Sequence, residues 1–203
     1  VAHSGIDHNL VGVFCVKIKE KINERFVLIE NLGQKSRERT REVKKVLQQI
    51  EKEVLYPYLR GKDVKKWFLK YTEYVIVPHN SDGSCLSESQ LKLKFPKLYS
   101  FLLKFKDKLI NRSTYKLMGK NKPFYSIFKI GNYTFSTYRV LFGRKAGQIA
   151  AVVSQPITDK FLGKTLPIPD YDVILIGCKS SDEAHYLCSV VNSLIVNLSL
   201  IHI

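Results

Sequence analysis

The sequence predicts an α+β fold in which mixed short strands pack with helices. Segments with strand patterns and segments with helix patterns both occur, but they do not alternate in the regular order of a parallel βαβ sheet. The chain has 203 residues, of which 45% are hydrophobic and 11% aromatic. This composition excludes a disordered chain and supplies enough apolar surface for a buried core.

Six segments have the alternation or the apolar, β-branched runs that are typical of strands. In chain order they are residues 12–19, 24–31, 74–77, 138–142, 149–154 and 173–177. The first two are expected to form a hairpin with its turn at Lys21-Ile22-Asn23. The tight connection Gly143–Gly147 predicts a second hairpin, between the fourth and fifth segments. Pro78 ends the third strand.

Four segments have helical spacing or capping signals. In chain order they are residues 43–58, 63–69, 96–109 and 182–194, the second being only a short helical turn. The first has apolar residues near helical spacing, although Val43–Leu47 also fits a strand. Pro96 suits the first position of the third helix, and its apolar positions fall on one face, at Leu98, Leu102, Phe105 and Leu109. Ser180 or Ser181 is expected to cap the last helix.

Positive charge is concentrated in the middle third of the chain. The formal net charge is +15, from 33 basic and 18 acidic residues. Lys92–Lys145 contains fourteen basic residues, one acid (Asp107) and twelve of the 23 aromatic residues, whereas Ala146–Ile203 has a net charge of −2. Charge placed only for solubility would mix signs. Cations interleaved with rings suit phosphates and bases, so nucleic-acid binding is favoured over a solvated basic face around an ordinary aromatic core.

Eleven residues of this segment are candidates for nucleic-acid contacts. They are Lys97, Lys104, Lys108, Arg112, Lys116, Lys120, Lys122, Tyr125, Arg139, Arg144 and Lys145. The first three share a stripe beside the apolar face of the expected helix 96–109 and suit phosphates. The next four lie in an expected loop, Arg112–Pro123, where an arginine can bridge a guanine edge. The last three flank the expected hairpin, and Tyr125 can stack or bond to phosphate. By contrast, Arg60 and Asp63 are expected to be structural.

The sequence lacks the residue patterns of several kinds of metal, cofactor and catalytic site. The four cysteines form no Cys-x-x-Cys pair, and the five histidines show no metal-ligand spacing with them. There is no Gly-rich cofactor turn, no Asn/Asp-Pro-Pro-aromatic segment and no P-loop. Pro169-Asp170 has no Asp/Glu-x-Lys after it, as a magnesium nuclease would require. We therefore assign no catalytic and no metal-binding residue. No apolar run approaches the roughly 20 residues of a membrane span, so no membrane partner is expected.

Several phrases occur in a recognisable order. They are IEKEVLYPYLRGKDVKKW (50–67), YVIVP (74–78), FPKLYSFLLKFK (95–106) and DEAHYLCSVVNS (182–193), with a weaker echo in SGIDHNLVGVFCVKIK (4–19). This order resembles the C-terminal specificity, or target-recognition, domain of N6-adenine DNA methyltransferases and of fused type II restriction–modification enzymes. The similarity covers roughly Ile50 to Leu194.

The resemblance implies sequence-specific binding of double-stranded DNA by a cytoplasmic protein. S-adenosylmethionine and the catalytic residues would belong to a methyltransferase domain of the same full-length protein that is absent from this chain. Residues 1–49 would form an N-terminal strand region of the recognition domain, 50–194 its main part, and 195–203 a tail or the start of another element. A start at Val1, without a signal segment, also suggests a piece of a longer protein. The alternatives are an RNA-binding module, a metal-dependent nuclease with an unrecognised site, and a protein–protein adaptor.

Overall fold

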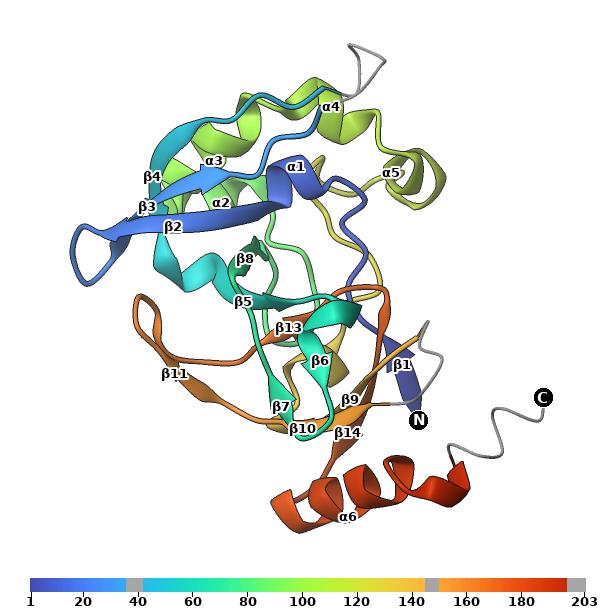
Figure 1. Cartoon of the computed structure of the whole chain (residues 1–203). Helices are drawn as coiled ribbons and strands as arrows, with labels where there is room; N and C mark the ends of the chain where they lie inside the picture. Colours follow the sequence, from blue (N-terminus) through green and yellow to red (C-terminus); the bar gives the residue numbers. More distant parts are fainter. Residues whose placement is uncertain (36–41, 145–149, 197–203) are drawn as a thin grey trace.

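The computed structural model describes residues 1–35, 42–144 and 150–196 and has an α+β fold (Figure 1). Its larger sheet has the strand order β13-β5-β8-β2-β3-β4. These strands are β2 (Cys15–Lys21), β3 (Phe26–Asn31), β4 (Leu47–Glu51), β5 (Leu55–Leu59), β8 (Glu73–Ile76) and β13 (Ile168–Pro169). Neighbouring strands are antiparallel, except that β13 runs parallel to β5. A short helix, α1 (Val11–Phe14), leads into β2.

A second sheet has four antiparallel strands in the order β1-β14-β9-β10 (Figure 1). They are β1 (Ala2–Ser4), β9 (Tyr138–Gly143), β10 (Ala151–Ser154) and β14 (Val173–Cys178). The helix α6 (Ser181–Val191) packs against this sheet. Just after α6, the side-chain amide of Asn192 accepts a hydrogen bond from the backbone N–H of Ala151 and donates one to its carbonyl, which fixes the end of the helix to β10.

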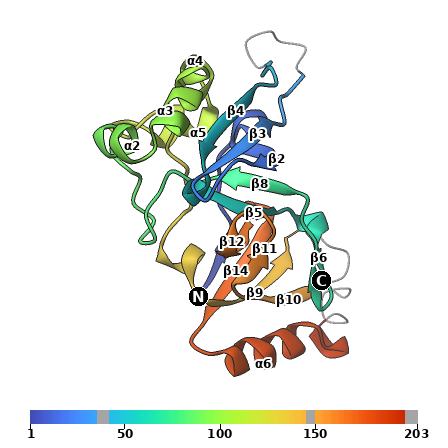
Figure 2. The same cartoon turned by 90° about the vertical axis from the view of Figure 1, so that its left-hand side faces the viewer.

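Four helices lie on one side of the larger sheet, as Figure 2 shows. They are α2 (Glu88–Lys94), α3 (Pro96–Leu103), α4 (Lys106–Ile110) and α5 (Ser113–Met118). Two small hairpins, β6 (Val64–Lys65) with β7 (Phe68–Leu69) and β11 (Ile157–Asp159) with β12 (Gly163–Thr165), complete the strands of the described residues. Short 3-10 helices occur at η2 (Lys52–Val54), η3 (Gly61–Asp63) and η4 (Asn132–Phe135).

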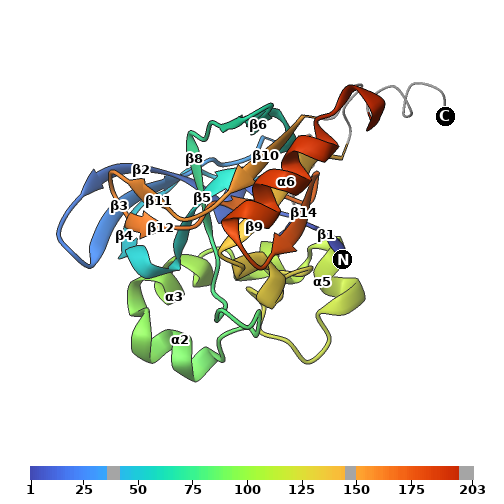
Figure 3. The ribbon, with the colours of Figure 1, turned by 90° about the horizontal axis from the view of Figure 1, so that it is seen from below.

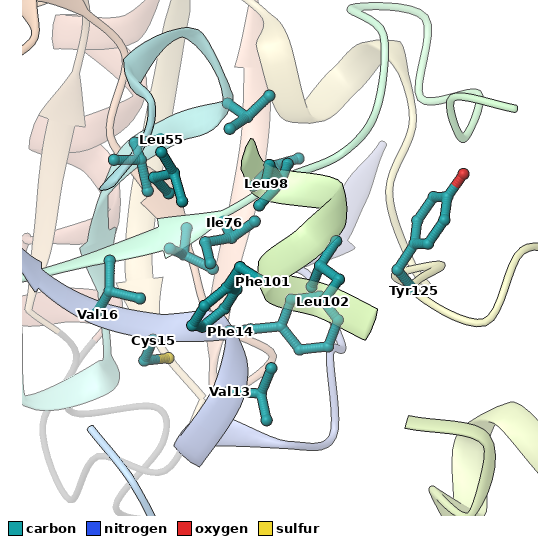
Figure 4. Packing of buried hydrophobic residues seen from close by; sticks show 14 of the residues in the cluster. Val13, Phe14, Cys15, Val16, Leu55, Ile76, Leu98, Phe101, Leu102 and Tyr125 are labelled. Carbon is teal, nitrogen blue, oxygen red and sulfur yellow. The ribbon is translucent and has the colours of Figure 1, made fainter. Parts of the chain in front are cut away.

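The main core lies between the larger sheet and these helices (Figure 4). Side chains from β2 and β8 meet α3 there; Val16, Ile76 and Phe101 are fully buried. The apolar face expected for residues 96–109 is confirmed, because Leu98, Leu102, Phe105 and Leu109 are all buried. Burial of such side chains supplies the main stabilising term for helices this short.

A buried carboxylate from the sheet caps α3. Glu51, at the end of β4, is fully buried, and its two side-chain oxygens accept hydrogen bonds from the backbone N–H groups of Lys97 (3.1 Å) and Leu98 (2.9 Å). Phe95, the residue before α3, supplies no cap of its own. Negative charge at a helix N-terminus is favourable, so this contact fixes the start of α3 on the sheet.

The elements with strong local signals are confirmed. The β2–β3 and β9–β10 hairpins, β8 and β14 lie where the alternation predicts them, apart from residues 145–149, which fall outside the described residues. The start of the first expected strand is helical instead, as α1. Ser180 is the cap of α6, and its hydroxyl accepts a hydrogen bond from the backbone N–H of Glu183.

Four other expectations are wrong in type or extent. Residues 43–58 form β4, η2 and β5 rather than a helix, because pairing with β3 and β8 outweighs the local helical spacing. Residues 63–69 form the β6–β7 hairpin after the single turn of η3. The helix expected at 96–109 is broken into α3 and α4 at Lys104-Phe105. The expected loop at 112–123 contains the whole of α5.

Candidate nucleic-acid interface

The clearest cationic region consists of α2 to α5 and the turn that follows, residues 88–122, which we call the helical layer. It has ten basic and two acidic residues and therefore a net charge of +8. Its exposed lysines are Lys92, Lys94, Lys104, Lys106, Lys116, Lys120 and Lys122, and Lys97 and Lys108 are half-buried. Lys92 forms an ion pair with Glu88 at 2.9 Å. Among the described residues, no carboxylate forms an ion pair with Lys104, Lys106, Lys116, Lys120 or Lys122.

Two lysines of α3 and the turn after it are positioned by the edge strand β4. Lys97 Nζ donates to the Gln49 side-chain oxygen at 2.5 Å and lies 4.2 Å from the centre of the Phe26 ring. Lys104 Nζ donates to the side-chain oxygen of Gln48. These partners are neutral, so they orient the ammonium groups without cancelling their charge. A phosphate approaching this edge would meet two positive charges in fixed positions.

The C-terminal part of the helical layer presents lysines on a braced turn. Gly119 ends α5, and the Tyr115 hydroxyl donates to the backbone carbonyl of Lys122 at 2.7 Å, which ties the turn to the helix. Lys116, Lys120 and Lys122 are exposed there. The expectation of a loop with solvent-facing cations therefore holds for the lysines, although half of the segment is helical.

Arg112 does not face solvent, contrary to its expected role as a base reader. Its side chain is 4% exposed. The guanidinium donates to four backbone carbonyls, those of Leu109, His8, Phe124 and Ser126, at 2.7 to 3.0 Å. Burial lowers the pKa of Arg112 to about 10. Arg112 therefore joins α4, the N-terminal segment and the 124–126 segment, and leaves no face for DNA.

Arg139 and Tyr125 are also internal and cannot contact DNA in this structure. Arg139 is fully buried in β9, where it donates to Thr134 O, Ser154 Oγ and Pro167 O. Burial lowers its pKa to about 9. Tyr125 is fully buried in the main core, and its hydroxyl donates to the carbonyl of Leu86 at 2.9 Å (Figure 4). The sequence predicts both side chains to be nucleic-acid contacts at the surface. In the structure they donate hydrogen bonds to buried acceptor groups instead.

Arg144 is exposed, at the end of β9. Its guanidinium lies 4.9 Å from the centre of the Tyr171 ring, and Lys129 Nζ lies 4.1 Å from the same ring. The two cations lower the pKa of the Tyr171 hydroxyl, with a hydrogen bond from Arg144 as the largest cause. Arg144 is separate in the fold from the helical layer. Lys145, its expected partner, lies outside the described residues.

The aromatic rings of the basic segment serve the core. None of the twelve rings between Phe95 and Phe142 is exposed, and Phe101, Phe105, Phe124, Tyr125 and Phe128 are fully or almost fully buried. The interleaving of rings and cations in this segment is therefore the pattern of an aromatic core with a basic surface. The helical layer can offer phosphate contacts, but it has no exposed ring on which a base could stack.

The exposed rings of the described residues lie outside this segment and outside the eleven candidates: Trp67 and Phe68 are neighbours on the β6–β7 hairpin, and Tyr186 lies on α6. Trp67 is 60% exposed and Phe68 57% exposed, both at the tip of the β6–β7 hairpin. Lys62, Lys65, Lys66 and Lys70 surround them and are also exposed. The signal in the sequence is the run Lys-Lys-Trp-Phe-Leu-Lys, which places two large rings directly among lysines. The prediction of a short helical turn at residues 63–69 obscures this pair of rings. In a helix, one of the two rings would be expected to face the core.

Arg60 and Asp63 are structural, as expected. The Asp63 carboxylate accepts a hydrogen bond from the backbone N–H of Arg60 at 2.9 Å, which closes the η3 turn. The Arg60 guanidinium forms an ion pair with Glu73 of β8 at 2.6 Å. These contacts attach the segment before the β6–β7 hairpin to the larger sheet.

Within the described ranges, no three histidine, cysteine or acidic side chains lie close enough to hold a metal ion. The four cysteines are free thiols, and burial raises the pKa of Cys15 to about 12. None of the helices in these ranges is long and apolar enough to span a membrane.

The chain is similar to two curated type II methyltransferases. The chain is similar to the type II methyltransferase M.MjaIV of Methanocaldococcus jannaschii, with 26% identity over 148 residues, which are 72% of this chain and 46% of that protein. It is also similar to the type II methyltransferase M.NspV of Nostoc sp., with 28% identity over 138 residues, or 68% of this chain and 24% of that protein. The chain thus spans less than half the length of either relative. No family model matches it.

Proposed function

We propose that this chain is the target-recognition part of an adenine-specific DNA methyltransferase or restriction–modification enzyme and binds double-stranded DNA. The observation that carries the proposal is the similarity to two type II methyltransferases in a chain that lacks a methyltransferase's cofactor and catalytic motifs. The helical layer, with its net charge of +8, supports it, because phosphate contacts supply much of the affinity of DNA-binding proteins.

In this proposal the lysines of the helical layer neutralise backbone phosphates. Lys97 and Lys104 contact one stretch of backbone from the β4 edge, and Lys116, Lys120 and Lys122 contact another from α5 and its turn. Lys108, half-buried on α4, lies between them in sequence and completes a set of six. These contacts position the protein on the duplex and carry no sequence information of their own.

Methyl transfer is assigned to another part of the protein. S-adenosylmethionine would bind there and supply the methyl group. The described residues include no site that fits this cofactor, because no strand leads into a Gly-rich turn. The role of this chain is to hold the duplex so that the catalytic domain, its expected partner, reaches one adenine.

The salt dependence of duplex binding tests the proposal. Fluorescence anisotropy of a labelled duplex is measured against the chain at several KCl concentrations. The six phosphate contacts of the helical layer should make the logarithm of the binding constant fall with the logarithm of salt at a slope of about −5, and any further phosphate contact should make the slope steeper by about 0.9. Absence of duplex binding at low salt, or a slope near zero, contradicts the proposal.

The same assay separates the alternatives. At fixed salt, single-stranded RNA should compete more weakly than duplex DNA, since the lysines of the helical layer are not accompanied by an exposed aromatic strand surface of the RNA-binding type. Stronger competition by RNA would replace the proposal with an RNA-binding module. Cleavage of plasmid DNA by the chain in the presence of Mg²⁺ would replace it with a nuclease.

A further inference from the structure

The β6–β7 hairpin carries its rings on a firmly attached base. Val64 of β6 is buried in a small core with Leu59, Leu141 and Leu175. Leu69, opposite Val64 in the hairpin, packs against the same core. Both strands of the hairpin are therefore held by apolar contacts at their base.

Backbone hydrogen bonds hold the hairpin as well. The backbone N–H of Lys70 donates to Asp63 O at 3.1 Å, which closes the hairpin below its tip. The backbone N–H of Trp67 donates to Ala151 O of β10 at 3.4 Å. The tip therefore projects from an anchored element.

The backbone conformation at the tip of the hairpin is unfavourable for the residue that occupies it. The turn has two residues, Lys66 and Trp67, and Trp67 has a φ of +75°. That region suits glycine or asparagine, and a bulky side chain there is strained. The ring also gains little burial, since Trp67 is 60% exposed. Neither turn geometry nor core packing accounts for a tryptophan at this position, whereas contact between the exposed ring and a ligand does.

The charge around the rings identifies the partner. Four exposed lysines, Lys62, Lys65, Lys66 and Lys70, surround the tip, and the one acid of the segment, Asp63, is turned inward to the Arg60 backbone. Among the described residues, no carboxylate forms an ion pair with any of the four lysines. A surface made for an apolar protein partner is depleted in lysine. Rings among uncompensated cations instead match a ligand with negative charges beside flat apolar faces.

We propose that the β6–β7 hairpin is a second DNA contact, in which the Trp67 and Phe68 rings stack against bases and the surrounding lysines bind the flanking phosphates. Base–aromatic stacking and insertion of apolar side chains at a base step are established modes of DNA contact. The inference rests on the proposed DNA-binding function and adds the place where bases meet protein. Figures 2 and 3 show this hairpin on a different side of the molecule from the helical layer, so it is a separate contact.

Trp67 is the only tryptophan of the chain, so its fluorescence reports on the hairpin directly. The 203-residue chain is titrated with unlabelled mixed-sequence duplex DNA while tryptophan emission and quenching by acrylamide are recorded. Stacking on a base should quench the emission and shield the ring from acrylamide at the same DNA concentration at which anisotropy shows binding.

The possible outcomes separate this inference from the proposed function. If anisotropy shows binding while Trp67 emission and acrylamide quenching stay unchanged, the hairpin inference is wrong and DNA binding stands. If anisotropy shows no binding, the proposed function fails, and the inference with it. If Trp67 is already shielded in the free chain, the rings are covered by protein, for example in a second copy, and the inference is overturned.

Two variants measure the contribution of the hairpin. Trp67→Ala combined with Phe68→Ala should weaken duplex binding by about tenfold to a hundredfold without changing the salt slope, since the rings are uncharged. Lys65→Gln combined with Lys66→Gln should reduce the magnitude of the slope by about 2. Tyr186→Ala, which removes a ring that is 73% exposed on α6, is the matched control and should leave binding unchanged. Equal loss in the control and the double ring variant would overturn the inference.

Discussion

The helical layer and the β6–β7 hairpin both present exposed lysines, but they differ in where their aromatic rings point. In the helical layer Phe101 and Phe105 face the core, and the exposed residues include lysines but no aromatic ring. In the hairpin Trp67 and Phe68 remain outside with the lysines. The first surface suits phosphates alone, and the second suits phosphates together with bases.

The difference has a physical origin. The four helices have five to eight residues each, too short to be stable alone, and buried rings such as Phe101 and Phe105 anchor them in the main core. The hairpin is anchored by Val64 and Leu69 and by backbone hydrogen bonds, so its rings are not needed for the fold. Rings that the fold does not need are free for a ligand. Exposed rings among exposed lysines are therefore a better guide to base contacts than the number of rings in a basic segment.

The largest expected effect removes charge from the helical layer. Replacing Lys104, Lys116, Lys120 and Lys122 together by Gln should reduce the magnitude of the salt slope by about 3 to 4 and weaken duplex binding by about a thousandfold at roughly 0.1 M salt. The slope is measured by anisotropy over a KCl series. Lys164→Gln, at an exposed lysine of β12, is the control. An unchanged slope in the fourfold variant would leave the hairpin as the main DNA contact.

Acid should loosen the helical side of the molecule. Burial lowers the pKa of His8 to about 3 and that of His79 to about 4, both below the ordinary value of 6.5. The charges of Arg112 and Arg60 act in the same direction on His8. Each histidine is therefore neutral in the fold, and its contribution to stability is present above about pH 6.5 and is lost as the pH falls toward the folded-state pKa.

Between about pH 7.5 and pH 5 this loss amounts to about 2 kcal/mol for each of the two histidines. Urea unfolding at several pH values measures the free energy. Hydrogen exchange locates the loss: the His8 carbonyl binds Arg112, so protection should fall around α4 and α5 before it falls in β6 and β7. A free energy of unfolding that is constant over this range would show that the histidines are not buried as neutral groups.

A single buried cation should matter more for the fold than any exposed one. Replacing Arg112 by Met removes donors from four buried carbonyls and should lower the free energy of unfolding by about 3 kcal/mol. Lys116→Met, one turn away and exposed, should leave it within about 0.5 kcal/mol. Thermal and urea unfolding give both values. Equal stability of the two variants would mean that Arg112 is a surface residue after all.

Elements with a local signal in the sequence are predicted correctly. The β2–β3 hairpin, the β9–β10 hairpin and the Ser180 cap follow from alternation, turn residues and a capping hydroxyl within a few positions. Residues 43–58 carry a helical spacing and yet form strands, because their structure depends on β3 and β8, which local periodicity does not include.

Candidate site residues are harder to predict than strands. Arginine is rarely buried, so the sequence places Arg112 and Arg139 at the surface; only the fold brings three or four unpaired acceptors around each. For Trp67 the error is the reverse, because a large ring is expected to be buried but is exposed. Its exposure depends on a hairpin turn whose sequence pattern is that of a short helix. The lysines are placed correctly more often, since the cost of burying an ammonium group keeps them at the surface.

The smallest effect on stability is expected for replacement of Trp67, and it contrasts the hairpin most sharply with the helical layer. Trp67→Asn places a residue that tolerates positive φ at the hairpin turn and removes a ring that is mostly exposed. The free energy of unfolding should stay unchanged or rise by up to about 1 kcal/mol, while duplex affinity falls. Phe101→Ala, the matched loss of a buried ring in the helical layer, should cost about 3 to 5 kcal/mol. A drop of more than about 1 kcal/mol in the Trp67 variant would mean that the ring serves the fold, and the contrast between the two regions would disappear.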